Sequence, residues 1–358
     1  MTDRKVSRAT TWTLPLLTSL ALVLSGNPFA HGAADSDDWV TLSDGVFARI
    51  VPASGNSVSN AGVVVLDRGV LVFDTHLTLE GAQALAQRIR SVTAKAVQYV
   101  VNSHFHPDHT HGNAIFSSAS CILSTAETRR DILLKDLPVL NRTLAAAQTQ
   151  LENLRKSVAA AQDPKQREAL RKQLAAREQV LGKMAALKVP VPVLIIEDSL
   201  TLEDGREVRL LNLGAGHTNG DLVMHLPWAK VAFVGDLFFN KALPNTQDAR
   251  LLDWIKALGE IQKLDADRFV PGHGRVGSRQ DLAGFLQYLL DLKAAVEPAV
   301  GRGDTLEQVV RETRLPEKYA SWEFQNFFPA NVQQMYVELK AQPPILPEPA
   351  RRPETSKP

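Results

Sequence analysis

The sequence predicts an α/β protein, and three observations support this prediction. Short runs rich in Val, Ile and Phe alternate with an amphipathic helical stretch over residues 45–103. Similar β-rich runs return at 190–274. Polar residues that can bind metals or move protons follow the ends of these runs, where α/β sheets commonly place their sites. With 358 residues, the chain is long enough for one large domain or two modest ones.

The first β-rich runs lie at 45–52, 61–67 and 69–75, and Gly, Asn and Asp turn signals separate them. Residues 79–92 then show helical spacing. The apolar residues on one face of this helix are Leu79, Ala82, Leu85, Ala86 and Ile89. A further strand at 96–103 leads directly into a histidine-rich stretch. The order strand, helix, strand, loop is typical of an α/β fold.

Residues 126–188 differ in kind. Steps of four and three form a heptad seam of Leu133, Leu137, Leu140, Leu144, Ala147, Leu151, Leu154 and Val158. Pro138 is expected to kink or restart this helix near its beginning, and 162–166 indicates a turn. The second helix carries Leu170, Leu174, Leu181 and Met184. We therefore predict an antiparallel helical hairpin at 130–188, which could be a solvated decoration, a lid or the contact of a homodimer.

This hairpin is inserted between two parts of the predicted catalytic domain, 34–129 and 189–342. In the second part, β-rich runs continue to residue 274, with helices expected at about 247–264 and 279–300. Residues 343–358 are rich in proline and polar residues and are predicted to be disordered.

The N-terminus is predicted to be a signal peptide, residues 1–33. Basic residues precede an apolar run at 12–24, which has the length of a signal-peptide core and is short for a membrane span. Small residues near Ala33 follow. We expect a periplasmic or secreted protein with no stable membrane insertion after cleavage; an uncleaved anchor is the alternative.

The composition excludes several classes of partner and site. Lys and Arg number 40 against 39 Asp and Glu, so the charge gives no reason to expect nucleic acid or an anionic membrane as a partner. The single cysteine, Cys121, excludes an intramolecular disulfide and a Cys-rich zinc site; we expect it to be a buried apolar residue. A metal site would therefore use histidine and carboxylate.

The stretch HFHPDHTHGN at 104–113 holds four of the nine histidines. In an extended or turning loop, His104 and His106 project to one side and can share a metal, while Asp108 and His109 can reach a second one. Imidazole and carboxylate suit zinc well, and also iron or manganese. Such crowding favours a metal site over histidines buried singly in a core.

Three later positions offer further ligands, each in a glycine-containing turn at a strand end. They are His217 in GAGHTNGD, Asp236 in FVGD and His273 in VPGHG. Burying these side chains without a metal would be costly, because no polar partner lies nearby in the sequence. The glycine spacing does not fit a dinucleotide motif, and the sequence contains no G-x-S-x-G motif of a serine hydrolase.

Three other histidines are expected to have no metal role. We expect His111 at the start of the helix after the motif, His76 as a polar loop residue and His225 as a strand residue.

The motifs HFHPDH, GAGHTNGD, FVGD and VPGHG, in this order, resemble those of the metallo-β-lactamase superfamily. The resemblance covers about residues 40–275, apart from the hairpin. It implies an αββα four-layer sandwich with metals at one edge. The implied ligands are His104, His106 and His217 for a first metal, Asp108, His109 and His273 for a second, and Asp236 as the bridge. Asp74 in VFDT matches the buried aspartate that braces the histidine loop in this superfamily.

Such a site predicts an exported hydrolase with two Zn²⁺ ions (or Fe or Mn) and a small-molecule substrate. A hydroxide shared by the metals is the expected nucleophile, and Asp108 would orient it and return a proton. True metallo-β-lactamases usually carry Cys or Ser at the position of Asp236, whereas thioesterase, lactonase and phosphodiesterase branches carry Asp. We expect cleavage of a small ester, thioester, lactone or lactam, and no nucleic-acid partner.

Two alternatives stay open. A mononuclear iron enzyme similar to the persulfide dioxygenases shares much of the motif set, although an intact second site with His109 and His273 argues against it. A non-catalytic, metal-stabilised interaction module would need only four ligands, whereas this chain offers seven.

Overall fold

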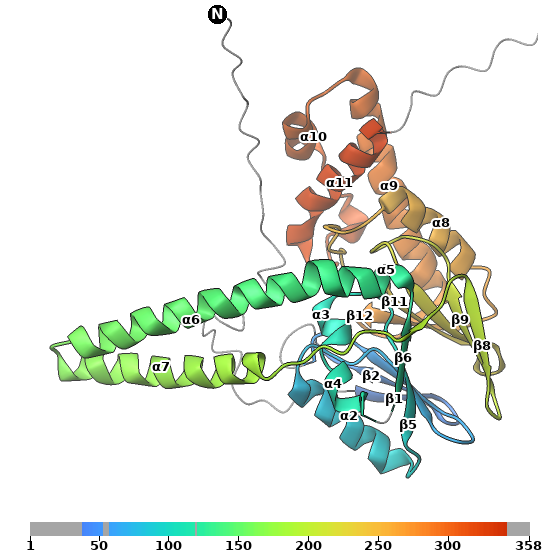
Figure 1. Ribbon diagram of the computed structural model, residues 1–358. Helices are drawn as coiled ribbons and strands as arrows, with labels where there is room; N and C mark the ends of the chain where they lie inside the picture. Colours follow the sequence, from blue (N-terminus) through green and yellow to red (C-terminus); the bar gives the residue numbers. More distant parts are fainter. Residues whose placement is uncertain (1–37, 53–56, 119, 342–358) are drawn as a thin grey trace, which may run out of the picture.

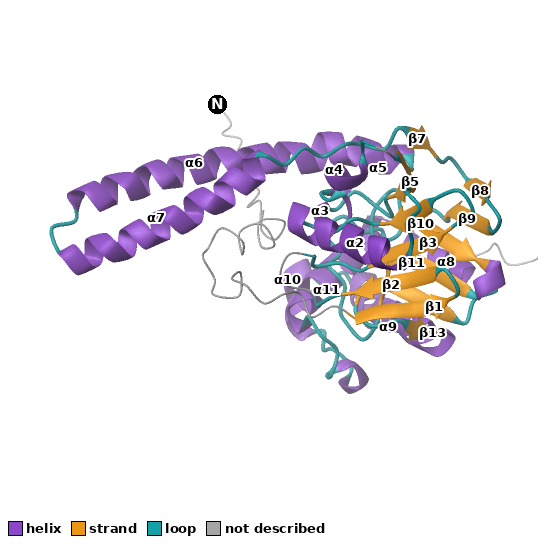
Figure 2. Ribbon diagram, turned by 90° about the horizontal axis from the view of Figure 1, so that it is seen from below, coloured by secondary structure: helices purple, strands orange, loops and turns teal. Residues whose placement is uncertain are grey.

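Two β-sheets pack face to face, with helices outside both, in the computed structural model of the chain (Figures 1 and 2). The structure describes residues 38–52, 57–118 and 120–341. The first sheet has the order β1 (Asp38–Ser43), β2 (Val46–Ile50), β3 (Ala61–Val65), β4 (Val70–Phe73), β5 (Val97–Val101), β6 (Cys121–Ser124) and β7 (Leu194–Ile195). The second has the order β13 (Gly277–Ser278), β12 (Arg268–His273), β11 (Val231–Phe239), β10 (Leu222–Leu226), β9 (Glu207–Asn212) and β8 (Ser199–Glu203).

Each sheet contains parallel pairs next to antiparallel ones. β4, β5, β6 and β7 run parallel to one another, and β11 runs parallel to β12. The chain therefore crosses from β4 to β5 through helix α2 (Leu79–Val92), and from β11 to β12 through helix α8 (Leu251–Ile261). In such sheets, ligand sites lie in the loops at the carboxyl ends of the parallel strands.

Three apolar clusters fill the spaces between the layers. Val64, Leu71 and Phe233 belong to the cluster that lies between the two sheets. On the outer side of the first sheet, Leu85 and Ile89 of α2 pack on the strands. The second sheet is covered by α8, α9 (Arg279–Arg302) and α11 (Phe328–Ala341). This arrangement confirms the predicted αββα sandwich.

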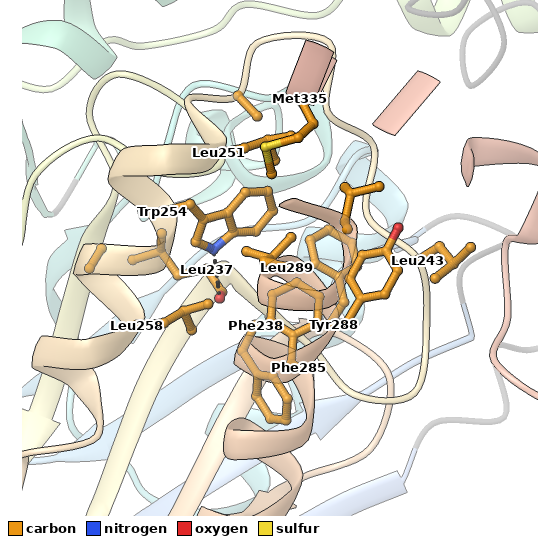
Figure 3. Close-up of a cluster of buried hydrophobic side chains, with 14 of the residues drawn as sticks. Leu237, Phe238, Leu243, Leu251, Trp254, Leu258, Phe285, Tyr288, Leu289 and Met335 are labelled. Carbon is orange, nitrogen blue, oxygen red and sulfur yellow. Dashed lines mark hydrogen bonds between the residues drawn. The ribbon is translucent and has the colours of Figure 1, made fainter. Parts of the chain in front are cut away.

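Figure 3 shows the cluster beneath the second sheet's helices, in which Trp254 of α8 is fully buried among Leu237, Leu258 and Phe285. Its indole Nε1 donates a hydrogen bond of 3.0 Å to the Leu237 carbonyl. Because the polar atom of Trp254 is satisfied by backbone of β11, the whole ring can be buried without an unpaired donor. This contact ties α8 to the strand that carries Asp236.

The helical insertion protrudes from the sandwich (Figures 1 and 2). It begins with α5 (Ala126–Asp131) and a π-helical turn, η2 (Ile132–Asp136), and continues as α6 (Leu137–Ala160) and α7 (Pro164–Ala185). Pro138 lies in the first turn of α6, so this helix restarts at the proline as expected. Asp163 caps α7 by accepting hydrogen bonds from the N–H groups of Lys165 and Gln166.

The apolar seam of α6 is used inside the hairpin. Its buried residues are Leu140, Thr143, Ala147, Leu151 and Leu154. Leu133 is 44% exposed, although the heptad pattern placed it in the seam. The π-helical turn explains the difference, because it inserts an extra residue and changes the helical phase before α6 begins.

Several short or C-terminal elements escaped sequence analysis. They are α3 (Pro107–Thr110), α4 (Asn113–Phe116), α10 (Leu306–Glu312), α11 and the 3₁₀ turns η3 (Pro227–Ala229), η4 (Glu317–Tyr319) and η5 (Gln325–Phe327). Cys121 is partly rather than fully buried, because it opens the short strand β6.

Within the described ranges, we find no helix that is both long and apolar enough to cross a membrane. The predicted signal peptide 1–33 and the predicted tail 343–358 lie outside the described residues.

Candidate metal centre

Loops and strand ends from both sheets bring the predicted ligands together. The loop after β5 carries the HFHPDH motif and continues into α3, where Pro107 supplies the first helical residue. His217 lies between β9 and β10, Asp236 lies in β11, and His273 ends β12. All of these side chains fall into two groups that could each hold a metal ion.

The first group contains His104, His106, His217 and Asp236, all buried. The Nδ1 atom of His106 lies 3.0 Å from His104 Nε2 and 3.0 Å from His217 Nε2. Asp236 Oδ2 lies 3.2 Å from His217 Nε2 and 3.9 Å from His104 Nε2. Three ring nitrogens and one carboxylate oxygen therefore converge on one small volume.

The second group contains Asp108, His109 and His273. Asp108 Oδ2 lies 3.3 Å from His273 Nε2 and 3.5 Å from His109 Nε2. The side chain of Asp108 is 19% exposed, more than those of His109 and His273, so it is the member of this group most open to solvent. The backbone carbonyl of Asp108 accepts a hydrogen bond from the Ser59 hydroxyl, which holds the turn in place.

Asp236 faces both groups. Its Oδ1 lies 3.3 Å from His109 Nε2, and its Oδ2 lies 3.5 Å from His273 Nε2 in addition to its contact with His217. Gly272, next to His273, makes room for this carboxylate, because a Cβ atom there would lie 1.8 Å from Asp236 Oδ1. The sequence motif VPGHG thus supplies His273 and also, through Gly272, leaves the space that the Asp236 carboxylate occupies.

The donor set fits a metal ion. Around a tetrahedral zinc with Zn–N bonds of about 2.0–2.1 Å, neighbouring ligand atoms lie about 3.3 Å apart, close to the 3.0 Å separations seen here. His109 Nε2, His217 Nδ1 and Asp236 Oδ1 are buried and have no hydrogen-bond partner among the described residues. For His109 Nε2 and Asp236 Oδ1, a bound cation would supply the missing partner.

Charge distinguishes the two groups. Burial lowers the pKa of His104 well below its ordinary value, so this imidazole stays neutral. Burial also acts to lower the pKa of His273, but the carboxylates of Asp236 and Asp108 outweigh it and raise the pKa to about 10. The pKa of Asp236 is held well below its usual range, since the surrounding histidines outweigh its burial. Asp236 is therefore ionised and able to bind a cation.

Asp74 lies directly behind the histidine loop. Its Oδ2 accepts a hydrogen bond of 2.8 Å from His109 Nδ1, and its Oδ1 accepts one of 2.7 Å from the Ser103 N–H. Asp74 has left-handed backbone (φ 62°) at the turn after β4, which aims the carboxylate at the loop.

Sequence reasoning missed a second supporting carboxylate, Asp248. Its Oδ2 lies 3.3 Å from His106 Nε2, and its Oδ1 accepts a hydrogen bond of 3.0 Å from Lys135 Nζ of the π-helical turn. Neither residue belongs to a recognisable motif. Only the fold brings them to the centre.

The other three histidines lie outside both groups. His111, between α3 and α4, places Nε2 3.0 Å from Asp136 Oδ2 of η2. His225 lies in β10. His76 lies in a loop, as expected, but it is fully buried, with left-handed backbone (φ 71°), and its Nδ1 lies 2.8 Å from the Ser59 carbonyl. The loop turns inward here, since the carbonyl of His76 accepts from the Gly112 N–H.

Aromatic rings close the centre from below. Phe239 stacks on His273 with ring centroids 5.6 Å apart, and Trp254 meets His217 edge-on at 5.4 Å. Because Phe239 and Trp254 are buried, they give the ligands an apolar, water-free surrounding on this side.

An αββα sandwich with two adjacent His/Asp groups at its strand ends is an arrangement that could hold metal ions. Comparison with known proteins specifies the family. The sequence profile of the metallo-β-lactamase superfamily matches residues 54–273, most of the chain. The protein belongs to the metallo-β-lactamase superfamily.

Individual relatives are distant. The chain is 24% identical over 269 residues to a linear primary-alkylsulfatase of a Pseudomonas species, a match that covers 71% of this chain and 49% of that protein. It is 33% identical over 98 residues to metallo-beta-lactamase type 2 of Bacteroides fragilis, covering 26% and 39%. This chain thus spans less than half the length of either relative.

A solved structure supports the fold. The metallo-beta-lactamase from Pontibacter korlensis superposes with a TM-score of 0.51 at 20% identity, covering 72% of this chain and 100% of that one. At this identity, the similarity concerns the fold alone.

Proposed function

We propose that the protein is an exported binuclear zinc hydrolase that cleaves a small ester, thioester, lactone or lactam. One observation carries the proposal: the Asp236 carboxylate faces both ligand groups, with Oδ1 3.3 Å from His109 Nε2 and Oδ2 3.2 Å from His217 Nε2. In this assignment His104, His106 and His217 hold one ion, Asp108, His109 and His273 hold the other, and Asp236 joins them.

The ions would supply Lewis acidity, which polarises a substrate oxygen and lowers the pKa of water. The residues of the chain provide the remaining functions. Asp108 is the residue assigned to catalysis, because its partly exposed carboxylate can accept and return a proton. Although burial acts to raise the pKa of Asp108, His109 and His273 lower it overall, so it begins as the ionised acceptor.

Zinc is the metal we favour, since a set of five histidines and two aspartates is too nitrogen-rich for magnesium or calcium. Iron and manganese bind the same donors and are the alternatives. A mononuclear iron enzyme would leave one of the two groups unused. A non-catalytic module would need only four ligands, whereas this chain places seven in two adjacent groups.

A sulfate ester is the second candidate substrate. A linear primary-alkylsulfatase matches 71% of this chain. Asp236 equally suits this candidate, because the ligand groups do not distinguish a sulfur centre from a carbonyl.

Location and assembly are part of the proposal. The signal-like residues 1–33 support export, the near-balanced charge supports a small-molecule substrate rather than nucleic acid, and the hairpin is the element through which two copies would associate.

The test is a hydrolysis panel of esters, thioesters, lactones, lactams and alkyl sulfates. Protein treated with chelator should be inactive and should recover when Zn²⁺ is restored. Asp108→Asn should lower kcat/KM at least about 100-fold, whereas Asp253→Asn, on the exposed face of α8, should have no effect. Turnover that survives metal removal, or an unaffected Asp108→Asn variant, would contradict the mechanism. Turnover of the sulfates alone would select the second candidate.

A further inference from the structure

Helix α11 lies beyond the part of the chain that matches the superfamily, 54–273, yet it presents a row of polar residues to the catalytic domain. Asn331, Gln334 and Glu338 are spaced by three and four, so they lie on one face of the helix. Buried polar groups need partners. The partners of this row lie in one short segment, residues 246–252.

Asn331 contacts the beginning of this segment. It is fully buried, and its Oδ1 accepts a hydrogen bond of 3.0 Å from the Thr246 hydroxyl. Its Nδ2 donates one of 2.8 Å to the Tyr288 hydroxyl of α9. The amide thereby links α11, α9 and the segment in the core.

Gln334 and Glu338 contact the rest of the segment. Gln334 Nε2 donates to the Ala249 carbonyl at 2.9 Å. Glu338 Oε1 accepts from the Leu251 N–H at 2.7 Å, and its Oε2 accepts from the Leu252 N–H at 3.0 Å. These are the first N–H groups of α8, so Glu338 caps this helix from outside, where a carboxylate is favoured.

Asp248 lies in the middle of the held segment. It faces away from α11 toward the metal centre, with Oδ2 3.3 Å from His106 Nε2. The opposite nitrogen of the same ring, Nδ1, is the atom that faces His104 and His217. A carboxylate on the far nitrogen fixes both the tautomer and the orientation of a ligating imidazole.

We propose that Asn331, Gln334 and Glu338 are positioning residues for the metal centre: they hold residues 246–252 in place so that Asp248 can orient His106. The inference rests on the proposed metal site and adds to it that the C-terminal helix is part of the site's support. Figure 1 shows α11 beside α9.

The test measures two properties of the wild type and of each variant. One is the zinc affinity, determined with Zn²⁺ alone in competition with a chelator, and the other is the absorption spectrum of the Co²⁺-loaded protein. Asn331→Ala and the milder Glu338→Gln should each weaken zinc binding at the first group about tenfold and shift the Co²⁺ spectrum. The matched control is Tyr336→Phe on the same helix. It removes the hydrogen bond to the Asp304 carbonyl and leaves 246–252 untouched. We expect it to lower thermal stability without changing zinc affinity.

A double variant shows whether the effect passes through Asp248. Asp248→Ala should weaken zinc binding about 10- to 100-fold, and adding Asn331→Ala should weaken it no further. Suppose that the wild type binds zinc. Fully additive effects of Asp248→Ala and Asn331→Ala would then overturn the inference and leave the proposed metal site standing. Equal zinc affinities of Asn331→Ala, Glu338→Gln and Tyr336→Phe would do the same. A wild type that binds no zinc would overturn both.

Discussion

Asp74 holds His109 from the side opposite the metal position: its Oδ2 lies 2.8 Å from His109 Nδ1. The same carboxylate accepts a hydrogen bond from the Ser103 N–H, at the start of the histidine loop. His109 Nε2 is thereby directed at Asp108 and Asp236. One buried carboxylate sets both the ring and the loop that carries the ligands.

Asp74→Asn keeps the shape of the side chain and removes its charge. We expect the second group to bind zinc about 10- to 100-fold more weakly, while the first group keeps its ion. Stepwise zinc titration against a chelator measures this. The control is Asp204→Asn, a buried aspartate whose partner is Arg68. Loss of the first ion in place of the second would contradict the assignment of Asp74 to His109.

Gly272→Ala should disrupt the metal centre by a steric clash alone. The new Cβ would lie 1.8 Å from Asp236 Oδ1, so the carboxylate must leave its position between the two groups. We expect loss of at least one bound zinc and of most activity. Gly284→Ala on α9 is the control, because its Cβ would meet no described atom within 4 Å. It should gain about 0.5–1 kcal/mol of stability. Full metal content in Gly272→Ala would contradict the prediction.

His76 should make stability fall in mild acid. Burial, with the nearby charge of Arg49, lowers its pKa to about 3, whereas in the unfolded chain it is about 6.5. Between these values the unfolded chain binds the proton and the folded protein does not. The free energy of unfolding should therefore fall by about 1.4 kcal/mol per pH unit as pH drops from about 6.5 toward 3.

His76→Asn should remove this contribution, and Asn tolerates the left-handed backbone at φ 71°. Urea unfolding of chelator-treated protein at several pH values from 4 to 7 gives the slopes. We expect the wild type to be steeper than the variant. Parallel slopes would show that His76 is not held neutral.

Shortening the hairpin should change the oligomeric state of the protein without changing its zinc content. Replacing residues 149–176 with a short Gly/Ser linker keeps η2, whose Lys135 contacts Asp248 and whose Asp136 contacts His111. We expect unchanged zinc content. Light scattering tests the homodimer contact, one of the three roles left open for the hairpin: in that role the full-length chain is a dimer and the shortened chain a monomer. Because α7 covers the α6 seam, the dimer contact must use other residues of the hairpin. A monomeric full-length chain would show that the dimer prediction is wrong.

Local sequence patterns were sufficient to predict much of the fold. Helix α2 begins and ends at the predicted residues, 79 and 92, because its apolar face and its Thr78 cap are both local features. The seven candidate ligands could be named because their motifs combine unusual residue types with strand-end positions. The structure brings those residues into two adjacent groups.

Contacts between distant segments could not be predicted in the same way. Asp248 and Lys135 are 113 residues apart, and neither belongs to a motif that points to the metal centre. The polar row of α11 resembles an ordinary solvated helix face until residues 246–252 are packed against it. The burial of His76 could not be predicted, because nothing local indicates that its loop turns inward.

Zinc content is the measurement that tests the two-metal assignment most directly. Purified mature protein, His106→Ala, His273→Ala and Asp236→Ala should be loaded with Zn²⁺, dialysed and analysed for bound metal. We expect about two equivalents in the wild type, about one in each histidine variant and fewer than two in Asp236→Ala. A wild type that binds a single equivalent, lost entirely in His106→Ala and unchanged in His273→Ala, would contradict the binuclear centre.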